Sequence, residues 1–227
     1  MAAEVIVPPV RRPSIVTRFH GLLFLALVAV TIAAYVNVPA NLELPMHWGR
    51  HGEPDWLWPR DIALSIAPTA ALVLLGLFGL VGNSALPQHL EAGGHVLRVA
   101  LAGLLGLMAV VQFGLLMIGI GSDIEVIRIL CGAVAVFLFI FGNELRGAQP
   151  QPYAGLRLPW TLRDPRVWSV VHQLTGGLFM LGSIVLVLVT WLWPDPATLI
   201  FALVGAILLP VGAGGVLSLT LARRRRA

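Results

Sequence analysis

The chain has 227 residues, of which 58% are hydrophobic and only 11% are charged. Soluble domains are typically about 45–50% apolar and about 25% charged, and here the apolar residues form long uninterrupted blocks, so the composition excludes a soluble globular protein. The formal net charge of +4 comes with 15 basic residues, all arginine, which flank the apolar blocks; this placement favours membrane orientation and predicts no direct binding to nucleic acid.

Six segments have the length of about 20 residues that a helix needs to cross the hydrocarbon core of a bilayer. They are residues 19–36, 62–82, 99–120, 124–142, 174–193 and 197–222. We interpret the first as an uncleaved anchor, because it is long for a secretory signal. The fourth begins with Glu125 and Arg128, which are spaced to pair at i,i+3 or to reach the headgroups. The sequence predicts an all-α, polytopic membrane protein, a six-transmembrane-helix bundle.

The arginines predict how these helices are oriented. Cytoplasmic flanks of membrane helices hold an excess of basic residues. With the N-terminus inside, 12 of the 15 arginines are cytoplasmic, and Arg50, Arg60 and Arg128 are outside. We therefore expect both termini in the cytoplasm.

The connections between the helices differ greatly in length. Residues 121–123 and 194–196 are tight turns, so the third and fourth helices, and the fifth and sixth, should be antiparallel neighbours. Two loops are too long and too specific in composition to be mere connectors, an extracytoplasmic loop at residues 37–61 and a cytoplasmic loop at residues 143–173. The candidate functional residues lie in these two loops.

The extracytoplasmic loop crowds glycine, proline, charged and aromatic residues into residues 44–56, which predicts a structured turn. Its tryptophans are typical of an aromatic belt at the headgroups. His47 and His51 lie near three carboxylates, but the glycines and prolines between them oppose a helix that would align the two imidazoles. We therefore expect no metal site and no other cofactor.

The cytoplasmic loop contains a predicted helix start. Either Thr161 or Asp164 could cap a short interfacial helix, and Pro165 suits the first helical position when Asp164 is the cap. Trp168 and His172 are then four residues apart on the same side of that helix.

This loop resembles the characteristic motif of the SdpI family of bacterial immunity proteins. The family pattern is a Gly-Asn pair, then Gly-Ile-Arg-Thr-Pro-Trp-Thr-Leu after a fixed gap, and later Val-Trp and His. The matching positions here are Gly142, Asn143, Pro150, Gly155, Arg157, Pro159, Trp160, Thr161, Leu162, Val167, Trp168, His172 and Gly176. The chain departs from the pattern at Gln151, Leu158 and Gln173, which puts polar contacts at those points in doubt.

The extracytoplasmic loop carries a second resemblance. Its Leu-Pro-x-His-Trp motif, followed by glycine and Pro-Asp, is similar to a domain of unknown function often fused N-terminal to the SdpI motif. We therefore divide the chain into an N-terminal two-helix membrane region, residues 1–95, and an SdpI-like four-helix membrane region, residues 96–227.

The resemblance implies a multi-pass protein of the bacterial plasma membrane that gives resistance to a secreted toxic peptide without catalysis. It also implies signalling by capture of an ArsR-type repressor at the cytoplasmic face. Peptide recognition is then expected at His47, Trp48, Asp55 and Trp56. Repressor docking, or a structural role, is expected at Asn143, Gly155, Arg157, Pro159, Trp160, Trp168 and His172.

Arg157 has two interpretations that the sequence leaves open. Beside Pro159 and Trp160 it could stack and bind a carboxylate of a partner, and it could equally contact lipid phosphate.

Two other functional classes remain open from the sequence. A transporter of a small molecule or peptide would use Pro68, Gln112 and Pro210, which interrupt apolar helices, although all three are also compatible with helix packing. A membrane metalloenzyme would use His47, His51 and the nearby carboxylates.

Overall fold

The structure is a computed structural model that describes residues 13–49, 52–193 and 195–224. Within these residues, six helices are long and apolar enough to cross a membrane. They are α1 (Arg18–Asn37), α2 (Arg60–Ser84), α3 (Pro87–Gly119), α4 (Val126–Arg146), α6 (Pro165–Leu192) and α7 (Pro196–Arg224). The all-α prediction and its six spans are confirmed.

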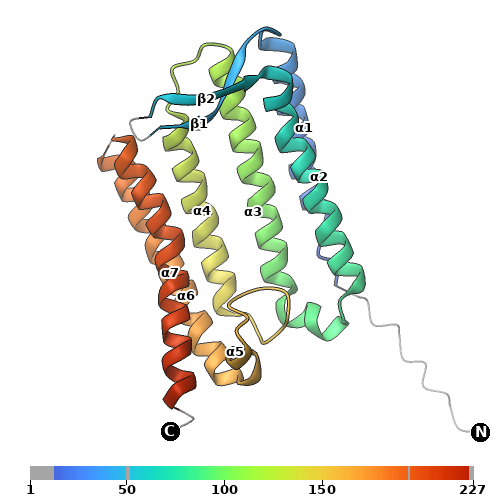
Figure 1. Ribbon diagram of the computed structural model, residues 1–227. Helices are drawn as coiled ribbons and strands as arrows, with labels where there is room; N and C mark the ends of the chain where they lie inside the picture. The colour runs from blue at the N-terminus through green and yellow to red at the C-terminus, as the bar shows by residue number, and fades with distance from the viewer. Residues whose placement is uncertain (1–12, 50–51, 194, 225–227) are drawn as a thin grey trace, which may run out of the picture.

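The six helices run side by side along one axis (Figure 1). A hairpin of two strands, β1 (Glu43–Trp48) and β2 (Pro54–Pro59), lies at one end of the bundle, here named the hairpin end. A short helix, α5 (Pro159–Arg163), lies at the opposite end, here named the loop end. The helices α1, α2 and α3 pack together, α4, α6 and α7 pack together, and α3 contacts α4. The predicted neighbours α3–α4 and α6–α7 are confirmed.

Three helices extend well beyond one end of their predicted spans. The helix α3 begins at Pro87 and α6 at Pro165, and α4 ends at Arg146. Hydropathy marks only the part of a helix that lies in hydrocarbon, whereas the backbone continues as helix into the polar zone. Asp164 caps α6, since its carboxylate accepts from the N–H groups of Arg166 and Val167, at 2.9 and 3.3 Å. The predicted cap is therefore confirmed, but the helix that Asp164 caps is the long helix α6 and not a short one.

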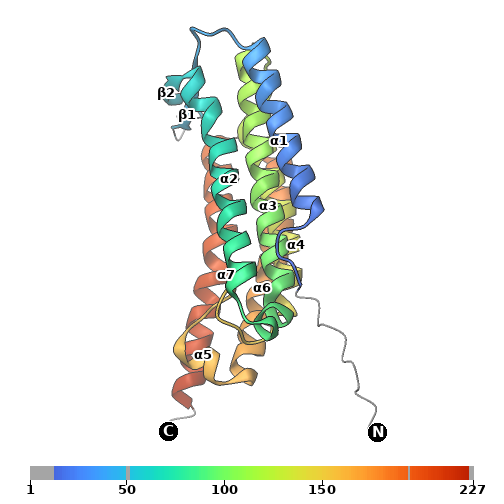
Figure 2. The ribbon, with the colours of Figure 1, turned by 90° about the vertical axis from the view of Figure 1, so that its right-hand side faces the viewer.

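The predicted structured turn at residues 37–61 is an antiparallel β-hairpin. Its register pairs Glu43 with Pro59 and Leu44 with Trp58. Leu44 is fully buried in a cluster with Leu64 of α2 and Leu115 of α3, which holds the hairpin on the helices. Figure 2 shows the hairpin displaced toward the side of α2 and α7, away from α1.

Pro68 and Gln112 complete one arrangement between α2 and α3. Proline has no N–H, so the carbonyl of the residue four positions earlier, Leu64, has no helical donor. The Nε2 of Gln112 donates to the carbonyl oxygen of Leu64 at 3.1 Å, and Gln112 is 0% exposed. Gln112 therefore supplies the donor that Pro68 removes from the Leu64 carbonyl.

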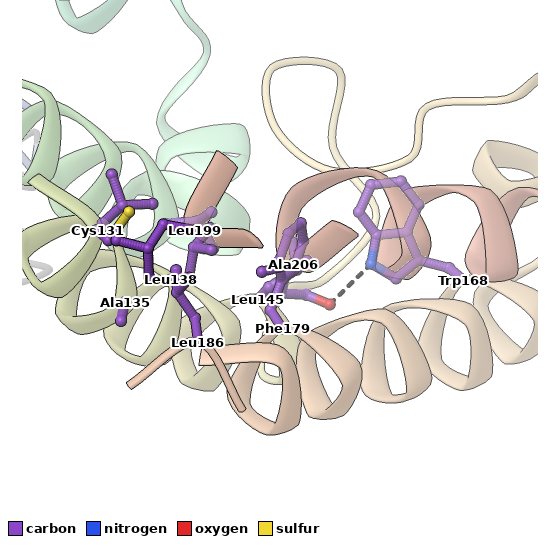
Figure 3. Packing of buried hydrophobic residues seen from close by; sticks show 12 residues of the cluster. Cys131, Ala135, Leu138, Leu145, Trp168, Phe179, Leu186, Leu199 and Ala206 are labelled. Carbon is purple, nitrogen blue, oxygen red and sulfur yellow. Dashed lines mark hydrogen bonds between the residues drawn. The ribbon is translucent and has the colours of Figure 1, made fainter. Parts of the chain in front are cut away.

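The second half of the bundle contains a cluster of buried apolar side chains from α4, α6 and α7 (Figure 3). The backbones of α4 and α6 touch, because a Cβ on Gly142 would lie 2.6 Å from the carbonyl oxygen of Gly176. Large apolar side chains such as Leu22, Leu80 and Phe201 are exposed on the outer faces, as expected of a bundle that faces lipid.

Candidate functional site

The predicted residues of the cytoplasmic loop gather at the loop end. Asn143 lies in the last turn of α4 and is exposed, and Gly155 and Arg157 lie in the α4–α5 loop, residues 147–158. The other four belong to helices: Pro159 and Trp160 to α5, and Trp168 and His172 to α6. The irregular segment is therefore shorter than the predicted loop at residues 143–173.

Trp168 and His172 form a buried stack on the first turns of α6. Their side chains are 1% and 0% exposed, and their ring centroids lie 3.9 Å apart. The indole Nε1 of Trp168 donates to the carbonyl oxygen of Ala148 at 2.7 Å, which Figure 3 marks with a dashed line. This bond fixes the beginning of the α4–α5 loop against α6.

His172 also holds the end of that loop. The backbone N–H of Leu156 donates to Nε2 of His172 at 2.9 Å, so Nε2 is an acceptor. The hydrogen therefore lies on Nδ1, which donates to the carbonyl oxygen of Trp168 at 2.8 Å. The imidazole is a bridge between the helix and the loop.

Gly155 is required by the same arrangement. Its φ of +96° lies in the region that side chains disfavour, and a Cβ at this position would collide with the Nε2 of His172. The glycine of the family motif therefore has a local steric reason.

Thr161 and Trp160 join α5 to its surroundings. The hydroxyl of Thr161 donates to the carbonyl oxygen of Leu156 at 2.6 Å and accepts from the N–H of Leu158 at 3.0 Å. The Nε1 of Trp160 donates to Oγ of Ser218 on α7 at 3.2 Å. Thr161 is one of the residues that match the family motif, but nothing in the sequence indicated that Ser218 takes part in this site.

Gln151 organises the loop, although it departs from the family pattern. Its Oε1 accepts from the N–H groups of Tyr153 and Ala154, at 2.6 and 3.0 Å, and its Nε2 donates to the carbonyl oxygen of Ala154 at 2.7 Å. The side chain lies against Gly93 of α3, where a Cβ would be 2.5 Å away. The polar contact that the departure put in doubt is thus made by glutamine.

The α4–α5 loop also contacts the first half of the bundle. The N–H of Gln149 donates to the carbonyl oxygen of Ala92 on α3 at 3.1 Å, and Tyr153 makes an edge contact with His89. Both contacts are made by the first turns of α3, which run across the end of the bundle in Figure 1. The predicted boundary between residues 95 and 96 falls inside α3, and the division of the chain stays a prediction.

Arg157 is exposed and its Nη1 donates to the carbonyl oxygen of Pro152 at 2.7 Å. Arg163 and Arg166 are exposed on α5 and α6 close by in the chain. The loop end therefore presents basic side chains outside the hydrogen-bonded interior of the site.

At the hairpin end, the structure brings together the predicted residues His47 and Asp55. The Nδ1 of His47 and the Oδ1 of Asp55 are 2.6 Å apart across the two strands. Trp56 is 57% exposed and makes an edge contact with Trp58, with ring centroids 5.5 Å apart. The predicted residue His51 lies outside the described residues, and among the described ones no group of three or more histidine, cysteine or acidic residues could hold a metal ion.

Two clefts separate the hairpin from α4 and α7. The larger has a volume of about 680 Å³ and is lined by His47, Trp48, Glu53 and Asp55 on the hairpin side. The smaller, about 310 Å³, contains the predicted ion pair of Glu125 and Arg128, which is confirmed at 2.8 Å. Trp48 lines both clefts, and the sequence gave no sign that this tryptophan faces helices far along the chain.

Residues 148–218 match the SdpI/YfhL protein family. This part of the chain belongs to that family. The SdpI region so defined contains the α4–α5 loop, α5, α6 and most of α7, and therefore includes Gly155, Trp168 and His172. The resemblance seen in the motif is confirmed.

The chain is similar to the protein named Immunity protein SdpI of Bacillus subtilis (strain 168). The two are 26% identical over 159 residues, which are 70% of this chain and 73% of the relative. No solved structure matches the chain. The six apolar helices and the match to the SdpI/YfhL family indicate a multi-pass protein of a bacterial membrane.

Proposed function

We propose that this chain is an immunity protein that protects a bacterial cell from a secreted toxic peptide. The observation that carries the proposal is the 26% identity over 70% of the chain to the relative named Immunity protein SdpI. The structure supports it with a compact hydrogen-bonded unit built from the family motif, in which buried Trp168 and His172 hold the α4–α5 loop.

In this proposal the hairpin end faces outward. The excess of arginine at the loop end agrees with the positive-inside rule and supports a cytoplasmic location of both termini. A secreted peptide then reaches His47, Trp48, Asp55 and Trp56 first. In this proposal the chain protects by binding the peptide and not by catalysis.

At the loop end we assign two roles. Gly155, Trp160, Trp168 and His172 are structural, because their polar atoms or backbone positions are used within the chain. The exposed residues Asn143, Arg157 and Pro159 form the candidate docking surface for an ArsR-type repressor. Arg157 is the residue best suited to a carboxylate of such a partner.

Protection is tested in a susceptible bacterium that lacks SdpI-family proteins. Cells with an empty vector and cells that express the chain are challenged with peptide fractions from the medium of the bacterium that encodes it. We expect at least one lethal fraction against which expression raises survival about tenfold or more. His47→Ala should lower this protection, and Glu43→Gln, an exposed change on the same hairpin, should not.

Equal killing of both strains by every lethal fraction would contradict immunity, provided that the chain is present in the membrane at normal abundance. Repressor docking is tested separately by Arg157→Ala. If immunity is kept but toxin-dependent recruitment of the repressor to membranes is lost, the two roles are separate. Unchanged recruitment removes Arg157 from the docking surface.

A further inference from the structure

The larger cleft has one polar wall and one apolar wall. Its hairpin side presents His47, Glu53 and Asp55, together with the indole of Trp48. The opposite wall consists of six side chains from α4 and α7, namely Val126, Ile127, Leu130, Cys131, Ile200 and Leu203. An occupant must therefore be amphipathic, because a purely polar one would leave this apolar wall uncovered.

The depth of the cleft corresponds to the membrane interface. Its apolar wall uses only the first turns of α4 and α7, so it extends from the helix ends to about 7–10 Å below them at 1.5 Å per residue. Amphipathic peptides that adsorb to a bilayer bury their apolar face by about 5–10 Å. A peptide adsorbed at this surface is thus at the height of the cleft.

The charge of the hairpin end favours a cationic occupant. Of the 11 acidic residues in the chain, seven lie at this end, in the segments that connect helices or in the first turns of α2 and α4: Glu43, Glu53, Asp55, Asp61, Asp123, Glu125 and Asp195. Only three of the 15 arginines lie in the same segments, and two of these, Arg60 and Arg128, are paired with Asp61 and Glu125.

Glu53 is the cleft acid best placed for such an occupant. Among the described residues its carboxylate has neither a hydrogen bond nor an ion pair, and it lies on the cleft wall. Asp55 shares the wall but is already paired with His47.

We infer that this cleft binds a cationic amphipathic peptide, with apolar side chains against α4 and α7 and a basic group at Glu53. The inference rests on the proposed function and specifies its ligand class. It also adds Leu130, Ile200 and Leu203 to recognition, which the sequence motif did not include. The cleft then binds the peptide while the peptide is adsorbed to the outer surface of the membrane.

The test uses the full chain in nanodiscs of zwitterionic phosphatidylcholine. The probe is a synthetic 18-residue amphipathic helix of leucine and lysine with a fluorophore, and its partner is a leucine and glutamate peptide of the same pattern. We expect the lysine peptide to bind loaded nanodiscs about tenfold more tightly than empty ones, which is roughly 1.4 kcal/mol. The glutamate peptide should show no such preference.

Matched variants locate the binding. Ile200→Trp fills the cleft and Glu53→Gln removes its free carboxylate, so each should weaken binding of the lysine peptide about fivefold or more. Phe201→Trp changes the next residue, which is 70% exposed, and should not change binding. Glu43→Gln removes an acid of the hairpin end that lies outside the cleft, so it should weaken binding less than Glu53→Gln does. Equal elution and helicity of the four variants confirm that they fold.

Three results overturn the inference: equal binding to loaded and empty nanodiscs, equal binding of both peptides, or unchanged binding by Ile200→Trp and Glu53→Gln. The last result would mean that the peptide binds outside the cleft. If the chain protects cells and both cleft variants protect equally well, the immunity function stands and the cleft is rejected. If the probe binds in the cleft but the chain never protects cells, the inference about the cleft stands and the immunity function is rejected.

Discussion

Gln112 shows how one residue makes a proline acceptable inside a membrane helix. In hydrocarbon no water replaces a missing backbone partner, so the free carbonyl of Leu64 needs a donor from a neighbouring helix. The amide of Gln112 supplies it at 3.1 Å. This pairing gives both residues a structural reason, and so weakens the transport hypothesis that used them as marks of a broken helix.

Replacement of Gln112 by leucine should therefore lower the free energy of unfolding by about 1 kcal/mol, the usual range for a hydrogen bond between membrane helices. In a Pro68→Ala background, position 68 regains its N–H and the carbonyl of Leu64 has a helical donor. The effect of Gln112→Leu should then fall to about zero. Denaturation of the wild type, the two single variants and the double variant in detergent micelles measures this coupling. Equal effects of Gln112→Leu in both backgrounds would contradict the pairing.

Gly155→Ala should destabilise the α4–α5 loop by about 1–3 kcal/mol, because φ is +96° and the new Cβ meets His172. Gly177→Ala is the matched control. It lies inside α6 with nothing within 4 Å of a Cβ, so alanine should be neutral or stabilising there. Thermal unfolding with limited proteolysis of the loop measures both, and equal behaviour of the two variants would remove the steric explanation.

At the scale of elements, the α4–α5 loop joins the two halves of the bundle. It is bonded to α6 through Trp168 and His172, and to α3 through the N–H of Gln149. The helix α5 follows it and is attached to α7 through Trp160 and Ser218. A segment without regular structure is thereby held in place by α6 and α3 and, through α5, by α7.

Trp160→Phe should loosen α5 from α7, because the ring is kept while the bond to Ser218 is lost. We expect a loss of about 1 kcal/mol and faster cleavage by protease near residues 157–163. Ser218→Ala should have a similar effect, and the double variant should be little worse than either single one. Strictly additive effects would mean that the two side chains do not act as a pair.

At the scale of the whole molecule, the distribution of arginines and the proposed function must agree on one orientation of the chain in the membrane. In the proposed function the hairpin end lies outside, where a secreted peptide would arrive, and the loop end lies inside, where a repressor would dock. In a Cys131→Ala background, which removes the sole cysteine, Glu53→Cys should react with a membrane-impermeant maleimide in intact cells. Arg157→Cys should react only after the membrane is opened, and its labelling in intact cells would reverse the proposed orientation.

The sequence by itself determined the features that depend on local chemistry. Long apolar blocks require lipid, so the six helices and their order could be predicted from hydropathy. The Asp164 cap and the Glu125–Arg128 pair could be predicted because both partners lie within three residues of each other. The SdpI motif could be recognised for a similar reason, since most of its residues lie in one continuous stretch.

Only the tertiary structure decided which distant residues meet. The strands of the hairpin were not predicted, because proline and glycine interrupt the alternation of polar and apolar residues. The two strands pair with each other, and the helices that bury their apolar side lie elsewhere in the sequence. The contacts of Gln112 with Leu64 and of Trp160 with Ser218 span 48 and 58 residues, and the clefts lie between residues 45–55 and helices that begin much later. No local pattern encodes such contacts, because they depend on how the helices pack in three dimensions.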